Sequence, residues 1–287
     1  MAEITEAFVK QFKGNMELLS QQKGSRLLPC VRLETGSFGE EEYFDQYGSD
    51  LAKVKVVRNS DVEYAANDYE RRRVSFIDVY WAKLVDKEDK LRMLIDPTST
   101  LAQAGAYAIG RKIDDMIIDA YFGTAKTGHA GGTDTTFTAA HQIAAGATGL
   151  TLAKLLAGKE ILDGHDVDPS EERYVIVTAK QMTNLLNTTE IKNTDYNSVK
   201  ALVEGQINTF LGFNFIRTER LTVDATPSRR CMMFSKEGIL LARQQEMGAK
   251  MDVIPTKHYA TQVYASVACG STRMDETRCV EIKCTEV

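Results

Sequence analysis

One long helical pattern between residues 97 and 123 constrains the fold of this chain more than any other sequence feature. The segment DPTS at 96–99 supplies a cap region and a proline for its start, and Gly123 ends it. Apolar residues recur at helical spacing in between, so about 22 residues form a rod of roughly 33 Å. Small residues fill its first half: Ala102, Ala104, Gly105, Ala106, Ala108 and Gly110. We therefore expect a spine helix that another element approaches closely.

The elements predicted around this helix mix strands and helices without regular alternation. Helices are expected at 152–163, after a Thr151 cap, and at 179–186 and 196–204. Strands are expected at 53–58, 74–80, 173–178, 213–217, 230–235, 250–254, 259–268 and 277–283. Residues 123–149, rich in Gly, Ala and Thr, are expected to form an exposed loop or a locally flexible segment. This pattern favours an α+β fold over a doubly wound α/β fold.

The stretch from residue 30 to residue 95 has β character with long polar interruptions. An acidic connection is expected at 35–48 and a polar segment with turns at 59–73. Two strands with so little core of their own are marginally stable in isolation. We therefore expect this stretch to project from the body and to gain burial from another molecule.

An apolar stripe marks the first 20 residues. Ile4, Phe8, Phe12 and Met16 recur at every fourth position, which places them on one face of a helix. Two interpretations stay open at this point. The segment is either a first helix packed on the chain's own core or an arm that lays its apolar face on a neighbouring molecule.

Composition limits the partners of this chain. Its 287 residues are 43% hydrophobic and 26% charged, which allows a sizeable core. A net charge of −5 lacks the Lys and Arg surplus of a protein that grips nucleic acid, so any enclosed genome is expected to make only weak, non-specific contact. The five cysteines include no CxxC pair, which argues against a zinc site. Since the sequence shows neither a secretion signal nor a long apolar run, we expect synthesis in the cytosol, reduced thiols and no membrane association.

Local motifs for catalysis, metals or cofactors are not found in the sequence. The glycine spacing at 123–128 resembles a phosphate loop, but His129 stands where that loop needs Lys. Arg111 lies one turn before Asp115, so an exposed intrahelical ion pair is expected there. We predict no catalytic residue, no metal site and no cofactor.

Two runs of like charge are notable: Glu40, Glu41 and Glu42, and Arg71, Arg72 and Arg73. Such runs usually lie on a solvated surface. Because guanidinium groups offer planar forks to carboxylates, the alternative is that the two runs clasp one another between neighbouring molecules. Each exposed ion pair stabilises an interface by only about 0–1 kcal/mol, so such a clasp would be important only when it is repeated over many interfaces.

Three stretches follow one another in a characteristic order. The first is DKED at 86–89 and LIDPTS at 94–99, leading into AIGRKID at 108–114. The second is RYVIVTAKQM at 173–182, and the third is VKALVEG at 199–205 followed by GFNFIRTERL at 212–221. In order and spacing they resemble the major capsid (coat) proteins of tailed bacteriophages: the junction of extended loop and spine helix, the opening of the axial domain, and its glycine-bounded helix with the following strand.

This resemblance, which covers about residues 30–285, implies an L-shaped shell subunit. Its expected parts are an N-terminal arm at 1–29, an extended β loop with flanking strands at 30–95, a peripheral domain with the spine helix at 96–172, an axial domain at 173–250, and C-terminal strands returning to the peripheral domain at 251–287. The candidate contacts between subunits are Phe8, Phe12 and Met16 of the arm and the two charge runs.

The function implied by the resemblance is assembly, as pentamers and hexamers, of an icosahedral virion shell around double-stranded DNA. Assembly is expected in the host cytoplasm. Because residues 1–29 leave no room for a cleavable scaffolding segment, a separate scaffolding protein is implied beside a portal. Two alternatives are kept: an encapsulin-type compartment, which resembles the same fold, and a cytosolic enzyme with an unrecognised site around Asp114, His165 and Asp168.

Overall fold

The structure, a computed structural model, describes residues 21–48, 52–55, 58, 61–62, 64, 69–86, 98–187, 209–224, 228–244 and 248–286. The predicted stripe of Phe8, Phe12 and Met16 and the predicted helix at 196–204 lie outside these residues. Helices combine with both parallel and antiparallel strand pairs, which confirms the α+β prediction.

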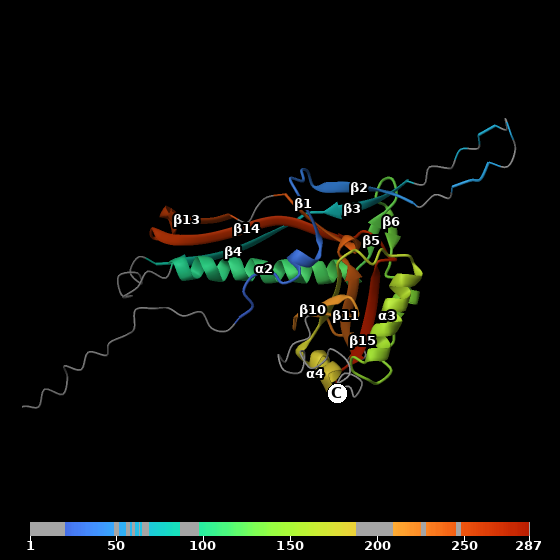
Figure 1. Ribbon diagram of the computed structural model, residues 1–287. Coiled ribbons are helices and arrows are strands. Elements are labelled where there is room, and N and C mark those ends of the chain that lie inside the picture. Colours follow the sequence, from blue (N-terminus) through green and yellow to red (C-terminus); the bar gives the residue numbers. More distant parts are fainter. Residues whose placement is uncertain are drawn as a thin grey trace, which may run out of the picture.

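The predicted spine helix is present as α2 (Thr98–Phe122). It packs along a five-stranded sheet. The strands of this sheet are β1 (Arg32–Thr35), β4 (Ile77–Val85), β12 (Ile239–Arg243), β13 (Gly248–Ile254) and β14 (Ala260–Arg273). Figure 1 shows α2, β4, β13 and β14 extending together away from the rest of the molecule; we call these four elements the spine region.

A second sheet lies at the C-terminal end of α2 and has six strands in the order β7-β15-β11-β8-β10-β9. In chain order they are β7 (Gln142–Ile143), β8 (Arg173–Val177), β9 (Thr209–Phe210), β10 (Phe213–Arg217), β11 (Ser228–Ser235) and β15 (Cys279–Thr285). Two helices accompany it: α3 (Leu152–Gly164), which lies against β15 and β7, and α4 (Ala179–Asn187). This sheet and the spine region meet at an angle, so the chain has the outline of an L (Figure 1).

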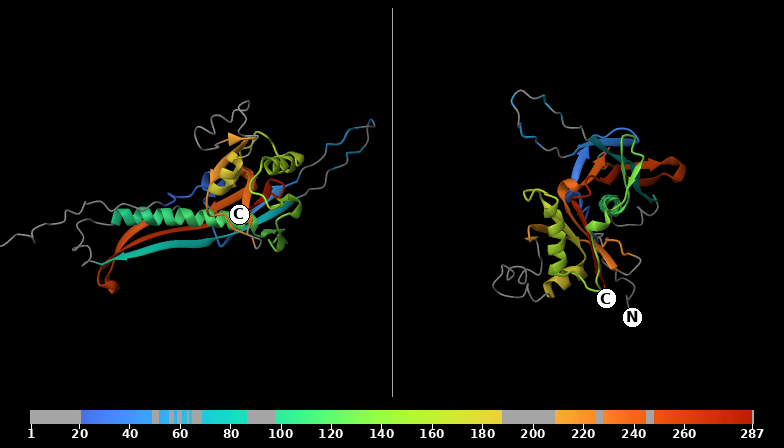
Figure 2. Two further views of the ribbon diagram at one scale, coloured as in Figure 1. Left: turned by 90° about the horizontal axis from the view of Figure 1, so that it is seen from below. Right: turned by 90° about the vertical axis from the view of Figure 1, so that its right-hand side faces the viewer.

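A third sheet carries a two-stranded ribbon, which we define as β2 (Glu41–Tyr47) and β3 (Tyr69–Ser75). The two strands pair antiparallel over their full length. β5 (Ala125–Thr127) and β6 (Thr133–Thr135) extend this sheet. Figure 2 shows that the ribbon leaves the body on the side opposite to the free end of the spine region. Four short 3₁₀ turns complete the assigned elements: Leu28–Cys30, Ala139–His141, Lys236–Gly238 and Pro255–Lys257.

One continuous core joins the spine region to the six-stranded sheet. Ile113 and Ile117 of α2 are buried in it with strand residues such as Ile176. Tyr121, near the end of α2, is fully buried, and its hydroxyl lies 2.7 Å from the carbonyl oxygen of Val280 in β15. A buried phenol needs such a partner, so this contact also sets the position of the helix end against the sheet.

The small residues of α2 allow close packing, as predicted. A Cβ added at Gly105 would lie 2.6 Å from the Trp81 ring of β4, and a Cβ at Gly110 would lie 2.6 Å from the backbone of Gly24 and Ser25. Neither distance is compatible with a side chain unless a neighbour moves. The glycines therefore bring one strand and one incoming segment directly against the helix.

Several strands with polar sequences were not predicted. Residues 35–48 contain β2 and not only an acidic connection, and β3 begins at Tyr69 inside the segment predicted as polar turns. Residues 123–149, predicted as a loop, contain β5, β6 and β7. These strands are short or have an exposed face, so their sequences lack the apolar runs that mark a buried strand. In the described part of the predicted strand 53–58, which is residues 53–55 and 58, no strand is present.

The elements predicted for the C-terminal half are present wherever the structure describes them, but β9 and β12 were not predicted. Thr151 caps α3, accepting the backbone N–H of Lys154, and β8, α4 and β10 lie where the sequence indicates them. Of the final strands, β13 and β14 lie in the five-stranded sheet, whereas β15 lies in the six-stranded sheet between β7 and β11. None of the helices in the described part of the chain is both long and apolar enough to cross a membrane.

Candidate functional site

Asp114, one of the residues of the enzyme alternative, has a structural role in the core. It is fully buried in α2. The side chains of Gln22 and Ser25 and the backbone N–H groups of Arg26 and Leu27 donate to its carboxylate at 2.5–3.2 Å. This carboxylate therefore anchors the chain segment that enters the body, and its acceptor positions are used internally.

The other two residues of that alternative have different partners. Nε2 of His165 lies 3.0 Å from Nε2 of His141, whose Nδ1 lies 2.8 Å from the carbonyl oxygen of Glu276. Asp168 accepts the backbone N–H of Ser170, a hydrogen bond that holds the pKa of its carboxyl below the ordinary value. The three residues thus do not share a site. Among the described residues, no group of three or more His, Cys, Asp or Glu side chains could hold a metal ion.

The ion pair predicted between Arg111 and Asp115 is wrong. Arg220 donates to both carboxylate oxygens of Asp115, at 2.6 and 2.5 Å, which raises the pKa of the arginine. Arg111 instead donates to the side chain of Gln21 and the carbonyl of Gln22. A bidentate contact from the loop after β10 is stronger than a single contact along one helix turn, and spacing within the helix does not reveal it.

The five cysteines are buried with free thiols. Burial raises the pKa of Cys30 to about 12 and that of Cys269 to about 11, so both are protonated at neutral pH. The pKa of Cys284 is lowered by a hydrogen bond with Cys231 and by the ammonium group of Lys154. That side chain is nevertheless completely buried, so it is not accessible to a substrate.

The two charge runs meet within one chain, because β2 and β3 pair in register. Arg73 lies 3.1 Å from the carboxylate of Glu41, and Arg71 lies 2.5 Å from that of Asp45. Since alternate residues of a strand point to opposite faces, Arg72 is turned inward between them. These arginines therefore have partners in their own subunit, and a clasp between subunits stays a prediction.

A buried ion network joins the root of the ribbon to the end of the spine helix. Arg72, only 6% exposed at its side chain, lies 3.2 Å from Glu276, and Glu276 lies 2.7 Å from the completely buried Arg273. Arg273 donates in turn to the last carbonyl groups of α2. Glu42 also faces inward and has one buried carboxylate oxygen without a hydrogen-bond partner. This network orients the ribbon relative to the spine region.

The spine region leaves one face of its sheet exposed. Val79 and Trp81 of β4 pack against the core, so the alternating residues Tyr80 and Leu84 point to the opposite side, which we call the outer face. Tyr80 is 71% exposed and stacks on Tyr264 of β14, with ring centroids 6.3 Å apart. Exposed apolar groups in one row are typical of an interaction surface.

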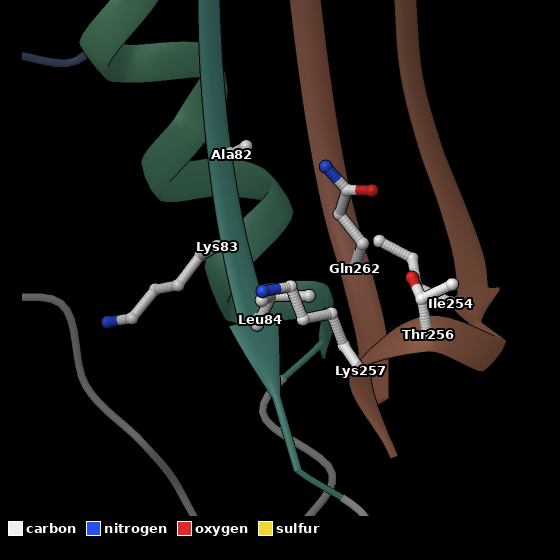
Figure 3. Close-up of a pocket in the computed structure, with 7 residues that line it drawn as sticks. All are labelled: Ala82, Lys83, Leu84, Ile254, Thr256, Lys257 and Gln262. Atoms are coloured by element: carbon white, nitrogen blue, oxygen red, sulfur yellow. The ribbon is translucent and has the colours of Figure 1, made fainter. Parts of the chain in front are cut away.

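A groove of about 460 Å³ lies at the free end of the outer face (Figure 3). Its lining residues come from β4, β13, the following 3₁₀ turn and β14: Ala82, Lys83, Leu84, Ile254, Thr256, Lys257 and Gln262. Figure 3 shows the side chains of Leu84, Ile254 and Gln262 beside one another, with Lys257 reaching towards Leu84. Because residues far apart in sequence meet here, local patterns do not reveal this surface.

The ribbon and the loop before it also expose aromatic rings. Tyr47 and Tyr69, directly opposite in the register, have ring centroids 5.2 Å apart and are 55% and 67% exposed. Phe38, just before β2, is 88% exposed. Sequence reasoning missed these residues; the signal that could have found them is an aromatic residue within a polar, strand-forming stretch.

Comparison with known proteins identifies the family. The sequence profile of a family described as phage capsid protein matches residues 4–286. No curated protein matches the sequence. The structure is similar to the capsid of cyanophage P-SCSP1u, with a TM-score of 0.76 and 15% identity over 100% of this chain and 96% of that chain. It is also similar to the capsid of Ralstonia phage GP4, with a TM-score of 0.75 and 11% identity over 100% and 98% of the two chains.

A chain of Mycobacterium phage Che8 has the same fold, with a TM-score of 0.72 and 14% identity over 96% of this chain and 97% of that one. At such identities the structural similarity establishes the fold, and the family follows from the profile that matches nearly the whole chain. Both agree with the resemblance seen in the sequence. This chain therefore belongs to the phage capsid protein family, and its role is that of a structural shell protein and not of an enzyme.

Proposed function

We propose that this chain is the major capsid protein of a tailed phage, and that identical copies assemble as pentamers and hexamers into an icosahedral shell around double-stranded DNA. The observation that carries this proposal is the match of the phage capsid family to residues 4–286. The encapsulin-type alternative is not favoured, because the family and the similar structures are phage capsids.

The geometry supports assembly. The spine region and the ribbon extend in opposite directions from the body (Figure 2), and each exposes apolar side chains, including Tyr80 and Tyr69. Burying a large apolar side chain stabilises a protein by about 1.5–3 kcal/mol, and an isolated subunit lacks this stabilisation at these positions. Contacts between two different patches of identical subunits form rings when the rotation between neighbours closes, as it does in pentamers and hexamers.

The N-terminal stripe is proposed as a further contact. Phe8, Phe12 and Met16 would lay their apolar face on a neighbouring subunit. Replacing Phe8 and Phe12 by Asp should then lower the yield of particles from the same amount of soluble chain. Normal yield and size would remove the arm from the set of contacts. Of the acidic run, Glu40 is the residue proposed to face a neighbour, because it is exposed whereas Glu41 pairs with Arg73.

The partners proposed beyond identical subunits are a portal, a separate scaffolding protein and the packaged DNA. With a net charge of −5, the chain is suited to contain DNA and not to bind it tightly. Assembly is proposed to take place in the host cytoplasm.

Size-exclusion chromatography of the purified full chain, with light scattering, tests this function. A shell protein elutes as capsomers or as megadalton particles. An enzyme of this length elutes as a small oligomer at every concentration, and that result would refute the proposal. The content of the particles distinguishes a phage shell, which packages DNA, from a compartment, which carries protein cargo.

A further inference from the structure

We propose that Phe38 of one subunit inserts into the groove at the free end of the spine region of the next subunit, with Glu40 facing Lys257. This contact rests on the proposed shell function and specifies one of its interfaces.

Phe38 is presented to solvent by a loop whose backbone is held in place. Its side chain is 88% exposed. The flanking Gly36 and Gly39 have φ values of +87° and +93°, which glycine adopts without strain. The N–H of Gly36 donates to the carbonyl of Arg243 at 3.2 Å, and the side chain of Gln244 donates to the carbonyl of Gly39. An aromatic ring held in water on an ordered loop is suited to insertion into a partner.

The groove has the chemistry to receive such a ring. Ala82, Leu84 and Ile254 give it apolar walls, and its volume of about 460 Å³ leaves room for neighbouring loop atoms beside the ring. Of the seven described residues that line it, none is acidic. Lys257 reaches towards Leu84, whereas the side chain of Lys83 points away to the other side of β4 (Figure 3). A ligand that combines an apolar group with a negative charge would therefore match it.

Glu40 supplies that charge next to the ring. It lies two residues after Phe38, within about 7 Å along the chain. Its side chain is exposed, as is that of Lys257. Within the described parts of the chain, neither of these two side chains takes part in an ion pair. The ring and the carboxylate on one side thus complement the apolar walls and the ammonium group on the other.

The chain's own loop is too far away to fill its own groove. The N–H of Phe76 donates to the carbonyl of Glu40 at 3.2 Å, which places the loop beside the start of β4. The groove lies eight residues further along β4, at Leu84, which corresponds to about 27 Å of strand. A Phe38 ring that enters this groove therefore comes from another copy. Since the two patches differ, the contact is heterologous, and it closes into a ring when the rotation between neighbouring subunits is one fifth or one sixth of a turn.

Disulfide trapping in assembled particles tests the contact. Full-length chain carrying Phe38→Cys and Ile254→Cys is assembled and then oxidised by dissolved oxygen with copper phenanthroline, which takes two electrons and two protons from each thiol pair. The five native cysteines are buried and do not compete. The matched control carries Phe38→Cys and Val223→Cys, because Val223 is 52% exposed and lies outside the spine region. We expect a ladder of crosslinked chains up to hexamers from the first pair and monomers from the control.

The other outcomes have distinct meanings. Normal particles without crosslinks from either pair overturn this contact and leave the shell function standing. Crosslinking of Ile254→Cys to Phe8→Cys in place of Phe38→Cys also overturns it, since the groove would then hold the N-terminal segment. Failure of the unchanged chain to form any particle overturns the proposed function itself.

A charge exchange gives a second test that does not depend on cysteine variants. Glu40→Lys should raise the subunit concentration needed for particle formation by about tenfold, and Lys257→Glu in the same chain should restore it. Both side chains are exposed, so the fold is expected to tolerate these changes. An unchanged concentration for Glu40→Lys, or no restoration by the reversed lysine, overturns the pairing.

Discussion

Asp114→Asn should destabilise the unassembled subunit strongly, although the size of the side chain hardly changes. The carboxylate is fully buried and accepts hydrogen bonds from Gln22, Ser25, Arg26 and Leu27. In the variant, an NH₂ group replaces one oxygen and faces groups that are themselves donors. The segment that enters the body would lose its anchor on α2.

The magnitude follows from these contacts. A hydrogen bond to a charged group contributes about 1.5–3 kcal/mol, and a buried donor left without a partner adds a penalty of its own. The asparagine keeps one acceptor oxygen, so we expect a loss equivalent to between one and two such bonds, about 3 kcal/mol. At about 2–4 °C per kcal/mol, Tm should fall by about 6–12 °C.

The neighbouring residue provides a matched control. Asp115 lies on the same helix and pairs with Arg220, but the two side chains are 28% and 33% exposed. Solvent screening weakens the attraction in that pair, so Asp115→Asn should lower the free energy of unfolding by only about 1 kcal/mol. Thermal unfolding of dilute, unassembled chain, followed by circular dichroism, measures both variants. If Asp114→Asn lowers Tm no more than Asp115→Asn does, the anchoring role assigned to Asp114 is wrong.

Three further predictions concern packing, the ion network and pH. Gly110→Ala should lower Tm, because the gain in helix propensity of about 1 kcal/mol is outweighed by an overpacking cost of about 1–3 kcal/mol. Gly164→Ala, whose added methyl group meets open space, should not lower Tm. Glu276→Gln leaves the buried Arg72 and Arg273 poorly paired. We expect the free energy of unfolding, measured in urea, to fall by about 3–5 kcal/mol, and amide exchange in the ribbon to become faster. Unchanged amide exchange in the ribbon would refute the role of the network. A hydrogen bond from Arg229 lowers the pKa of Glu286 from 4.5, so the stabilisation by this pair is present above pH 4.5 and is lost as the pH falls through the lowered pKa. Glu286→Gln should therefore make the free energy of unfolding depend less on pH in that acid range. The same pH dependence in the variant and the unchanged chain would contradict this.

The elements with strong local signals could be predicted from the sequence. The small residues between Ala102 and Gly110 indicated close packing on the spine helix, and the structure places Trp81 and the Gly24 backbone there. The Thr151 cap marked the start of α3 because capping is a contact between neighbours in sequence. The order of three moderately specific stretches identified the family, which the match to residues 4–286 confirms.

Contacts between distant parts of the chain could not be predicted in this way. Asp115 pairs with Arg220 and Arg72 pairs with Glu276, and in each pair the two residues are more than a hundred positions apart in sequence. For Asp115, helix spacing favoured the wrong partner, Arg111. For Arg72, the sequence indicated no partner within the chain. The ribbon strands were missed because their burial depends on pairing with each other and not on an apolar pattern. The groove brings together residues 82–84 with 254–262, which only the sheet order juxtaposes.

Cryo-electron microscopy of particles formed by the full-length chain tests the central claim most directly. The account predicts closed shells with five-fold and six-fold capsomers, in which the outer face of each spine region is covered by a neighbouring subunit. A chain that stays monomeric at high concentration, with Tyr80, Phe38 and the groove still exposed to solvent, would contradict it.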